Sequence, residues 1–346
     1  MRKDIFYIPE SLIQFNNAAS KAREDIDTIL RCSGLRPLLS LNIKSWTTKV
    51  SKFKLSYWRF LYYMYTTKNK RILLQYPHYG RIIRKAFDCL TANNNIIFFV
   101  HDLEYLRFDN TKQQLYYEVA LLNKADVVVS HNSVMTRRMR QDGVVVPIVE
   151  LELFDYLLSD VVPEKCNDFD RKVVFAGNLA KSDFLKKEAI QNMDFKLELY
   201  GSGFSETAMG WKNVHYAGSF KPNEVPYKLQ GSFGLIWDGT SVDTCDGRTG
   251  EYMRYNNPHK LSLYIVSGLP VIVWEEAAIA ELVKKYQIGL TVSSVHEISD
   301  KIQGLSNKEY KRMVDNVKKL QGKLAKGYFT KKALAEVVDI LSNTKS

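Results

Sequence analysis

The sequence predicts an α/β protein with two Rossmann-like domains in succession, each built on a parallel sheet. At 346 residues the chain is too long for one typical hydrophobic core and suits two. Short β-rich runs alternate with helical patterns, which is typical of βαβ units. A polar segment at 159–171 interrupts this alternation, which then restarts. We therefore expect one domain over 1–158, a second over 172–325, and a C-terminal helix at 326–346, for which packing back on the first domain is an option.

Six strands are expected in the first domain. The runs IIFFV and VVV are apolar throughout, as expected for strands that helices cover on both faces. The expected strands cover 4–8, 38–43, 71–76, 95–101, 126–131 and 146–151. The expected helices cover 18–31, 47–66, 81–92, 112–123 and 134–141.

The second domain repeats the pattern. Its expected strands cover 172–175, 196–200, 213–216, 233–237, 270–274 and 289–292. Its expected helices cover 223–230, 259–267, 277–286 and 295–304, and a helical tail over 308–341 breaks at 327–329. Two such sheets would face each other across a cleft at the carboxyl ends of their strands, where open α/β sheets bind ligands. Residues that directly follow strands are therefore the candidates for a site.

Composition favours a globular cytoplasmic protein. Hydrophobic residues make up 45% of the chain and charged residues 25%, which is ordinary for a globular protein. The four cysteines are scattered without a CxxC pair, which argues against a zinc site and a disulfide framework. The longest apolar runs are strand-sized, far short of the roughly 20 residues of a membrane helix. The N-terminus lacks the apolar region of a signal peptide.

The formal net charge of +11 is unevenly distributed. Between Thr28 and Phe87 there are thirteen Lys and Arg and no Asp or Glu, and Trp and Tyr residues are interleaved with them. Such a segment could contact an anionic membrane surface, where basic residues anchor and Trp and Tyr lie among the headgroups. It could also bind nucleic acid, or form the solvated face of an amphipathic helix. Nothing else in the chain favours nucleic acid, so we expect no nucleic-acid partner.

The segment from Phe233 to Trp274 carries the most site-like pattern. An apolar strand is followed by a polar loop, and a helix then opens at the run Asn257-Pro-His-Lys. Asn257 is expected as the N-cap, with the proline at the first helical position. The N–H groups of a helix N-terminus bind phosphate, and Lys260 and His259 would add cationic donors. We expect a diphosphate site here; the alternative is a capped surface helix with an incidental lysine.

Two further loops of the second domain follow strands. The run Gly177-Asn178-Leu-Ala-Lys181 ends its first strand, and Gly177 would let the backbone approach a ligand while Lys181 reaches a phosphate oxygen. Ser219 and Phe220 lie in a loop after its third strand, where the ring of Phe220 could stack on a base. Each pattern is common in loops without a ligand.

In the first domain, acid and histidine side chains emerge together after the strand NIIFFV. A general base must lie within hydrogen-bond reach of the substrate hydroxyl that it deprotonates. Asp102 is the preferred candidate, followed by His101 and Glu104; the alternative for Asp102 is a helix cap.

Other polar residues also follow strands of the first domain. His131 and Asn132 follow the next strand and could contact a substrate. Asn16 and Asn17, after the first strand, would face the diphosphate.

Several nucleotide-binding motifs are missing from the sequence. No glycine-rich dinucleotide fingerprint follows the first strand, which argues against an NAD enzyme. No GxxxxGK[ST] occurs, which excludes a P-loop, and no DxD stands at the end of a strand. We therefore expect no metal and no cofactor, and expect helix ends and lysines to carry the charge of a leaving diphosphate.

Five stretches of the sequence carry a family resemblance. They are VVVSHNSVMT, VFAGNL, YAGSF, FGLIWDGTSVDTCDG and NNPHKLSLYIVSGLPVIVW. With them, the chain resembles the WbbI-like family of bacterial β-1,6-galactofuranosyltransferases of O-antigen synthesis, a branch of the GT-B superfamily. It more distantly resembles the adhesin glucosyltransferases that act on protein-linked N-acetylglucosamine.

In that more distant family an Arg, a Tyr and a Lys are implicated in UDP binding. By motif position these fall on Lys181, Phe220 and Lys260, of which only Lys260 is unchanged. A lysine lacks the bidentate fork of an arginine, and Phe220 lacks the hydroxyl of a tyrosine. The resemblance thus supports a phosphate role for Lys260 and leaves the other two contacts open.

The resemblance implies an inverting transferase that takes galactofuranose from UDP-galactofuranose, and the missing DxD motif adds the expectation that transfer needs no metal. The N-terminal domain would bind a saccharide acceptor, lipid-linked and at the cytoplasmic face of the membrane, and the C-terminal domain the donor. Asp102 would deprotonate the acceptor, and UDP would leave against Lys260, His259 and the helix N-terminus. Sugar hydroxyls would be read by three carboxylates of the preceding loop, Asp238, Asp243 and Asp246. In such a transferase, His131 and Asn132 could contact the sugar or the acceptor.

Two alternatives to this galactofuranosyltransferase remain at this point. A glucosyl- or galactopyranosyltransferase using UDP-glucose or UDP-galactose on a glycan or glycoprotein would need few residue changes. A non-catalytic UDP-sugar-binding module is the second, and the sequence leaves open whether the chain forms a homo-oligomer.

Overall fold

The computed structural model describes residues 4–9, 19–38, 58, 61–77, 81–108, 111–159, 169–204 and 210–343. The chain divides into two compact units. Unit 1 comprises Met1–Leu151 with Phe329–Ser346, and unit 2 comprises Glu152–Tyr328. Most of the polar segment expected as a linker, 160–168, lies outside the described residues.

Unit 1 is built on a six-stranded sheet in the order β2-β1-β3-β4-β5-β6, and its described strand pairs are all parallel. The order reverses between β1 and β3, as in doubly wound folds. The expected strand at 71–76 is found with the same bounds, whereas the one at 38–43 lies almost wholly outside the described residues. The strands are β1 Ile5–Tyr7, β2 Arg36–Pro37, β3 Arg71–Tyr76, β4 Asn95–Val100, β5 Val127–Ser130 and β6 Ile148–Glu150.

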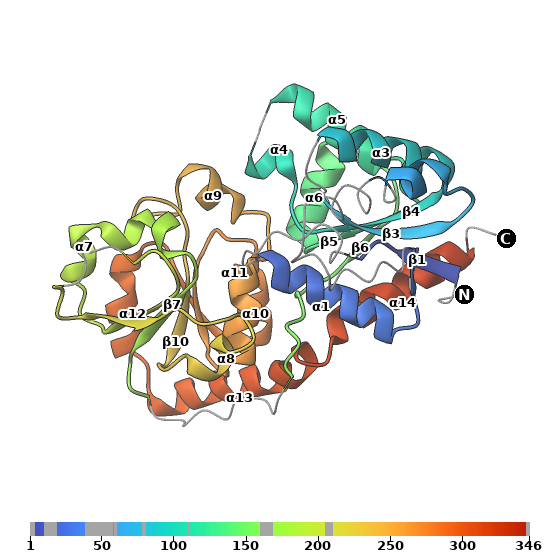
Figure 1. The fold of residues 1–346 in the computed structure, drawn as a ribbon. Helices are drawn as coiled ribbons and strands as arrows, with labels where there is room; N and C mark the ends of the chain where they lie inside the picture. The colour runs from blue at the N-terminus through green and yellow to red at the C-terminus, as the bar shows by residue number, and fades with distance from the viewer. Residues whose placement is uncertain are drawn as a thin grey trace. The chain divides into compact units, whose positions relative to one another are not determined.

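Helices lie on both faces of this sheet, with α3 and α5 on one side and α1 and α14 on the other (Figure 1). The apolar runs of β4 and β5 are buried along nearly their whole length because both faces are covered. Of the helix expected at 47–66, only Trp58 and 61–66 are described, and these residues are helical. The helices are α1 Ala19–Cys32, α3 Arg81–Asn93, α4 Glu104–Arg107, α5 Lys112–Leu122, α6 Ser133–Gln141 and α14 Tyr328–Asn343.

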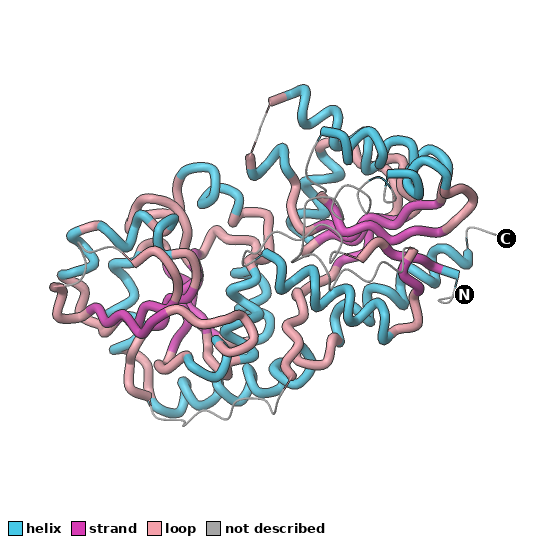
Figure 2. Tube along the Cα trace, in the orientation of Figure 1, coloured by secondary structure: helices cyan, strands magenta, loops and turns pink. Residues whose placement is uncertain are grey.

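Unit 2 contains a second parallel sheet, in the order β12-β11-β10-β7-β8-β9. Counted within the unit, this is the Rossmann order 3-2-1-4-5-6, and the order reverses between β7 and β10. Figure 2 shows these strands enclosed by helices. Both sheets confirm the predicted α/β class. The strands are β7 Val173–Ala176, β8 Leu197–Tyr200, β9 Val214–Gly218, β10 Phe233–Ile236, β11 Val271–Trp274 and β12 Gly289–Val292.

The helices of unit 2 include two that the sequence did not predict, α7 and α9, and α9 follows the polar loop after β10. The helical tail is found, but its break lies at 325–327 and not at 327–329, because Tyr328 and Phe329 already belong to α14. Helix α13 begins with a capping box in which Ser306 and Glu309 satisfy each other's backbone N–H groups. The helical segments are η4 Leu179–Lys181, η5 Asp183–Lys186, α7 Glu188–Gln191, α8 Val225–Lys228, α9 Gly247–Tyr252, α10 His259–Val266, α11 Ile279–Tyr286, η7 Val295–Glu297, α12 Ile298–Gln303 and α13 Asn307–Leu324.

Candidate functional site

The site of unit 2 is organised where β7 and β10 separate. These strands pair at Val173 and Val174. Towards the carboxyl ends of these strands, the Tyr264 hydroxyl of α10 bridges their backbones. It accepts from the N–H of Ala176 in β7 (2.8 Å) and donates to the carbonyl of Leu235 in β10 (3.1 Å). Tyr264 is fully buried. It therefore fixes α10 against the strand-order reversal, the position at which doubly wound sheets bind ligands.

The start of α10 differs from the predicted cap. Pro258 occupies the N-cap position in an extended conformation and provides no side-chain cap, so the expectation that Asn257 caps the helix and Pro258 opens it is wrong. The amide of Asn257 instead donates to the carbonyl of Glu152 (2.8 Å). A residue before proline favours extended backbone, which turns its side chain away from the helix. Asn257 thus anchors the helix start to the beginning of unit 2.

Lys260 lies one turn before Tyr264 and faces the end of β7. Its Nζ is 4.2 Å from the ring centroid of Phe175. A Cβ atom at Gly177 would lie only 3.0 Å from the Lys260 Cε, and Gly177 has φ +156°. The structure thus brings Gly177 and Lys260 together, and a glycine at 177 leaves room for the lysine.

Burial lowers the pKa of the Lys260 ammonium, while the nearby Asp238 carboxylate acts in the opposite direction. A partly desolvated cation at a helix N-terminus is unfavourable on its own, because the helix end carries a partial positive charge. A bound anion would relieve both costs. The electrostatics of this position therefore suit a phosphate group.

Tyr156 connects the start of α10 to the loop that follows β9. Its ring is stacked on that of His259, with centroids 4.9 Å apart, and its hydroxyl donates to the carbonyl of Pro222 (2.5 Å). The loop also carries Ser219, which is exposed, and Phe220, whose ring lies 6.3 Å from that of Tyr200. Tyr156 thus contacts both the loop expected to stack on the base and the helix expected to bind the diphosphate. The sequence analysis did not single out this residue.

The carboxylates of the loop after β10 have partners within the loop or in a neighbouring segment. Asp246 accepts from Thr240 Oγ1 (2.7 Å) and the N–H of Ser241 (3.1 Å). Burial raises its pKa, but these bonds and the N–H of Thr240 outweigh burial and the pKa is lowered. Asp243 is exposed and lies 3.3 Å from His296 Nε2. Asp238 accepts from the N–H of Gly239 (2.9 Å).

Two more expected donor contacts lie after β7. Asn178 accepts from the N–H of Ala180 (3.1 Å) and caps the turn η4. Lys181, at the end of that turn, is exposed. These residues surround the same strand end as Gly177.

In unit 1, the candidate base residues follow β4. His101 Nε2 lies 2.6 Å from Gln75 Oε1, and Asp102 forms an ion pair with Arg107. Glu104 is buried, and its carboxylate accepts from Gln114 Nε2 (3.2 Å). Among the three, His101 and Asp102 are partly exposed. The helix cap of α4 is Leu103, not Asp102.

His131 and Asn132 have structural partners in the described part of unit 1. His131 is buried, its Nε2–H donates to the carbonyl of Val100 (3.1 Å), and burial lowers its pKa to about 3. Asn132 caps α6 by accepting from the N–H of Met135 (2.8 Å). Their assignment to the acceptor stays a prediction. Asn16 and Asn17 lie outside the described residues.

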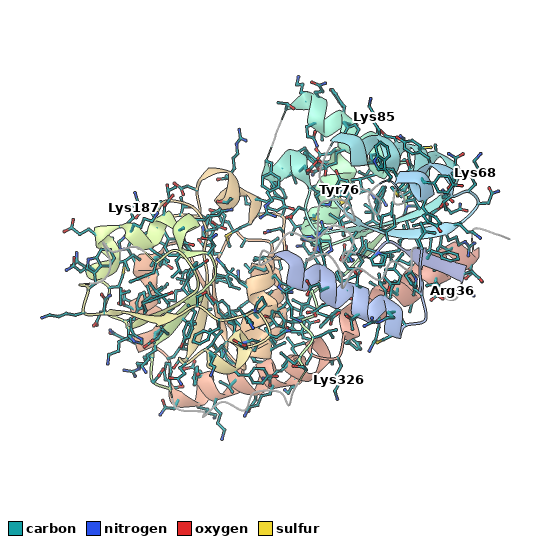
Figure 3. All side chains as sticks on the ribbon, viewed as in Figure 1. Arg36, Lys68, Tyr76, Lys85, Lys187 and Lys326 are labelled. Atoms are coloured by element: carbon teal, nitrogen blue, oxygen red, sulfur yellow. The ribbon has the colours of Figure 1, made fainter. Side chains whose placement is uncertain are left out.

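A buried carboxylate that the sequence analysis did not single out supports the segment after β4. Glu118 of α5 accepts from the N–H groups of Glu104 and Tyr105, both at 2.9 Å. Burial raises its pKa to about 7, although these bonds and one from Tyr76 act in the opposite direction. Tyr76, labelled in Figure 3, ends β3. Glu118 holds the N-terminus of α4, and its position inside an ordinary helical pattern gave no signal of this.

Two absences concern the described residues alone. No group of three or more His, Cys, Asp or Glu side chains in this part of the chain could hold a metal ion. No described helix has both the length and the apolar character of a membrane span.

Comparison with known proteins defines the class. Models of the N- and C-terminal domains of glucosyltransferase 3-like proteins match residues 7–153 and 173–337. β-1,6-Galactofuranosyltransferase WbbI of Escherichia coli K12 is 35% identical over 253 residues, which cover 71% of this chain and 72% of that protein. Glucosyltransferase 3 of Streptococcus parasanguinis is 30% identical and covers 70% of each chain.

Solved structures share the fold. The sucrose-phosphate synthase of Thermosynechococcus elongatus superimposes with a TM-score of 0.63 at 12% identity, covering 98% of this chain and 99% of that one. HepE of Anabaena, solved with UDP and glucose, gives 0.59 at 13% identity, with the same coverage. The chain is a glycosyltransferase with the GT-B type of α/β fold. It belongs to the glucosyltransferase 3-like family.

Proposed function

We propose that this glycosyltransferase moves galactofuranose from UDP-galactofuranose to a saccharide acceptor, with inversion and without a metal ion. The observation that carries the choice of sugar is the 35% identity to WbbI, which is named a β-1,6-galactofuranosyltransferase. Inversion corresponds to one in-line displacement at the anomeric carbon. The acceptor oxygen forms the new bond as the bond to the diphosphate oxygen breaks.

Unit 2 binds the donor in this proposal. HepE, which shares the fold, was solved with UDP. The start of α10 offers backbone N–H groups, and Lys260 adds a cation whose pKa burial lowers. A diphosphate placed there would gain a charge-assisted contact that strengthens as negative charge develops on the leaving oxygen. The loop with Phe220 would contact the nucleoside, and Asp238 and Asp243 the sugar.

Helix dipole and lysine together replace the role that a divalent cation has in other nucleotide-sugar sites. The support for this is the placement of Lys260 against Gly177 and Phe175. Transfer in the presence of EDTA at the rate found with added Mg²⁺ would agree with the proposal, whereas loss of transfer in EDTA would contradict it.

Unit 1 supplies the general base, from the segment His101–Asp102–Glu104 after β4. His101 and Asp102 are partly exposed there, and Glu104 is buried. A base in this segment takes the proton from the acceptor hydroxyl as the hydroxyl oxygen attacks.

The acceptor in this proposal is lipid-linked, and unit 1 contacts an anionic membrane surface. Trp58, Tyr62 and Tyr65, spaced at i, i+4 and i+7 in the sequence, are exposed, with 65%, 65% and 45% of their surfaces accessible. Lys68 and Lys70 follow them, in the stretch of the sequence without acidic residues. Lys68 and Lys85 both extend from unit 1 in Figure 3.

Vesicle sedimentation tests this surface. Binding to vesicles with phosphatidylglycerol should exceed binding to phosphatidylcholine vesicles and should fall with added salt. Changing Trp58 and Tyr62 to Ser should weaken it, and changing Tyr116, an exposed tyrosine of α5, to Ser should not. Equal binding to neutral vesicles would contradict the proposal.

Donor competition tests the sugar. Purified enzyme is given UDP-galactofuranose, UDP-galactose or UDP-glucose with a membrane extract that carries lipid-linked saccharides, and products are identified by mass spectrometry and linkage analysis. Transfer of galactofuranose with inverted configuration supports the proposal. Transfer from UDP-glucose or UDP-galactose but not from UDP-galactofuranose would make the protein a hexopyranosyltransferase instead. The name of the glucosyltransferase 3 relatives makes UDP-glucose the first alternative donor to test.

A further inference from the structure

The side-chain amide of Gln75 lies buried beside the candidate base residues. Gln75 belongs to β3 and only 1% of its surface is accessible. Its Nε2 donates to the carbonyl of Arg23 (3.2 Å) and to Asp27 Oδ1 (2.7 Å), both in α1. Its Oε1 lies 2.6 Å from His101 Nε2. A polar residue inside an apolar strand thus connects α1 to the end of β4.

These contacts fix the orientation of the amide. The Arg23 carbonyl can only accept a hydrogen bond, so the NH₂ group of Gln75 must face α1. The amide oxygen then faces His101 and carries no hydrogen, so the hydrogen of this bond belongs to His101 Nε2. A neutral imidazole has one N–H, which leaves the lone pair on Nδ1.

Charged groups on several elements surround this network. On α1, Arg23 donates to the carbonyls of Pro77 (2.8 Å) and Gln75 (3.4 Å), and Asp27 accepts from Gln75. After β4, Asp102 is ion-paired with Arg107. After β5, His131 is uncharged near neutral pH because burial lowers its pKa to about 3.

We propose that Gln75 is a positioning residue that holds His101 as its Nε2–H tautomer, and that His101 Nδ1 is the atom that takes the acceptor proton. The inference rests on the proposed glycosyl transfer. The hydroxyl proton passes to Nδ1 while the acceptor oxygen bonds to the anomeric carbon, and the bond to the diphosphate oxygen breaks with its electron pair leaving on UDP. The imidazolium then donates Nε2–H to Gln75 Oε1, which stabilises the new charge. Asp102, held by Arg107, orients the segment.

The tautomer can be measured without substrate. Two-dimensional ¹⁵N–¹H NMR of the histidine side chains distinguishes the tautomers, and the His101 signals are those missing from His101→Gln. The neutral ring should show the Nε2–H pattern in the wild-type protein and a tautomer mixture in Gln75→Leu. The Nδ1–H pattern in the wild-type protein would overturn the proposal, even if the enzyme transfers sugar as proposed.

The pH profile tests the proton transfer. In the double variant Gln75→Glu with Asp27→Asn, one carboxylate oxygen receives Nε2–H and the other meets the amide introduced at position 27, while the Arg23 carbonyl loses its donor. The His101 titration in the NMR spectra and the acid limb of kcat/KM should both move up by about one pH unit. A purely structural role for Gln75 would change the rate and leave both midpoints where they are, which would overturn the proposal.

Two further variants separate the candidate bases. His101→Gln should lower kcat by about 10²-fold or more, whereas Asp102→Asn should keep most of the activity. The opposite ranking would make Asp102 the base. UDP affinity should be unchanged in both variants. If the wild-type protein shows the expected tautomer but transfers no sugar, the proposed function is wrong while the positioning of His101 by Gln75 still holds.

Discussion

The phenol ring of Tyr156 lies against the imidazole of His259, with the ring centroids 4.9 Å apart and the planes at 17°. Two residues away in the chain, the Phe154 carbonyl accepts from the hydroxyl of Ser262 (2.6 Å). The first residues of unit 2 are therefore bound along the first turn of α10. The Tyr156 hydroxyl also donates to the carbonyl of Pro222, in the loop after β9 that carries Phe220. The first residues of unit 2 therefore set the position of this loop relative to α10.

Tyr156→Phe removes the hydrogen bond to Pro222 and keeps the stacked ring. One such bond contributes about 0.5–1.5 kcal/mol, so we expect UDP to bind about 2- to 10-fold more weakly, as measured by calorimetry. Tyr156→Leu also loses the stacking and should weaken binding further. UDP affinity that stays the same in both variants would show that the loop does not contribute to the donor site.

Gly177→Ala should displace Lys260. The added methyl would lie 3.0 Å from Cε, at a φ that side chains rarely adopt. We expect UDP affinity to fall at least 10-fold and stability to fall by about 1 kcal/mol or more. Gly322→Ala in α13 is the matched control, because a Cβ there meets nothing within 4 Å. It should keep UDP binding and raise stability by up to about 1 kcal/mol.

Tyr264→Phe leaves two buried backbone groups without their hydrogen-bond partner, the N–H of Ala176 and the carbonyl of Leu235. We expect the free energy of unfolding, measured by urea denaturation, to fall by about 1–3 kcal/mol. Tyr328→Phe, at an exposed ring, serves as the comparison and should change stability little. Equal stability of the two variants would mean that β7 and β10 do not need the Tyr264 hydroxyl to satisfy these backbone groups.

Glu118 predicts a pH dependence of stability. Its pKa in the folded chain is about 7, against 4.5 for the ordinary carboxyl, so the folded state favours the protonated form. This contribution is fully present below about pH 4.5 and is lost as the pH rises through 7, a change of about 3 kcal/mol at most. Glu118→Gln should flatten the pH profile of the melting temperature over this range. If the pH profile of Glu118→Gln matches that of the wild-type protein, a group other than Glu118 causes the pH dependence.

Much of the fold follows from the sequence because its signals are local. Apolar runs bounded by polar turns gave β3 and β12 with their observed bounds. Helix α9 was missed because its sequence, GRTGEY, contains two glycines and no apolar periodicity. The cap of α10 was misplaced because Asn257 has a partner at Glu152, 105 residues earlier in the chain.

The candidate site is less readable from sequence because its supports are distant contacts. Lys260 stood out through its place at a helix start, but nothing local indicates that Gly177 makes room for it. Gln75 reads as a polar interruption of a buried strand until α1 supplies its two acceptors. Tyr156 lies in a stretch without regular structure, and only its stacking on His259 reveals a role.

The account depends most on where the leaving diphosphate is held. The most direct test is calorimetric titration of UDP in EDTA into the wild-type protein, Lys260→Met and the control Lys196→Met, whose exposed lysine precedes β8 at the opposite end of the sheet. We predict binding in EDTA that Lys260→Met weakens by about 10- to 100-fold, since charge-assisted contacts contribute about 1.5–3 kcal/mol, and that Lys196→Met leaves unchanged. Equal UDP affinity of Lys260→Met and the wild-type protein, or UDP binding that requires a divalent cation, would contradict the claim that Lys260 and the start of α10 hold the diphosphate.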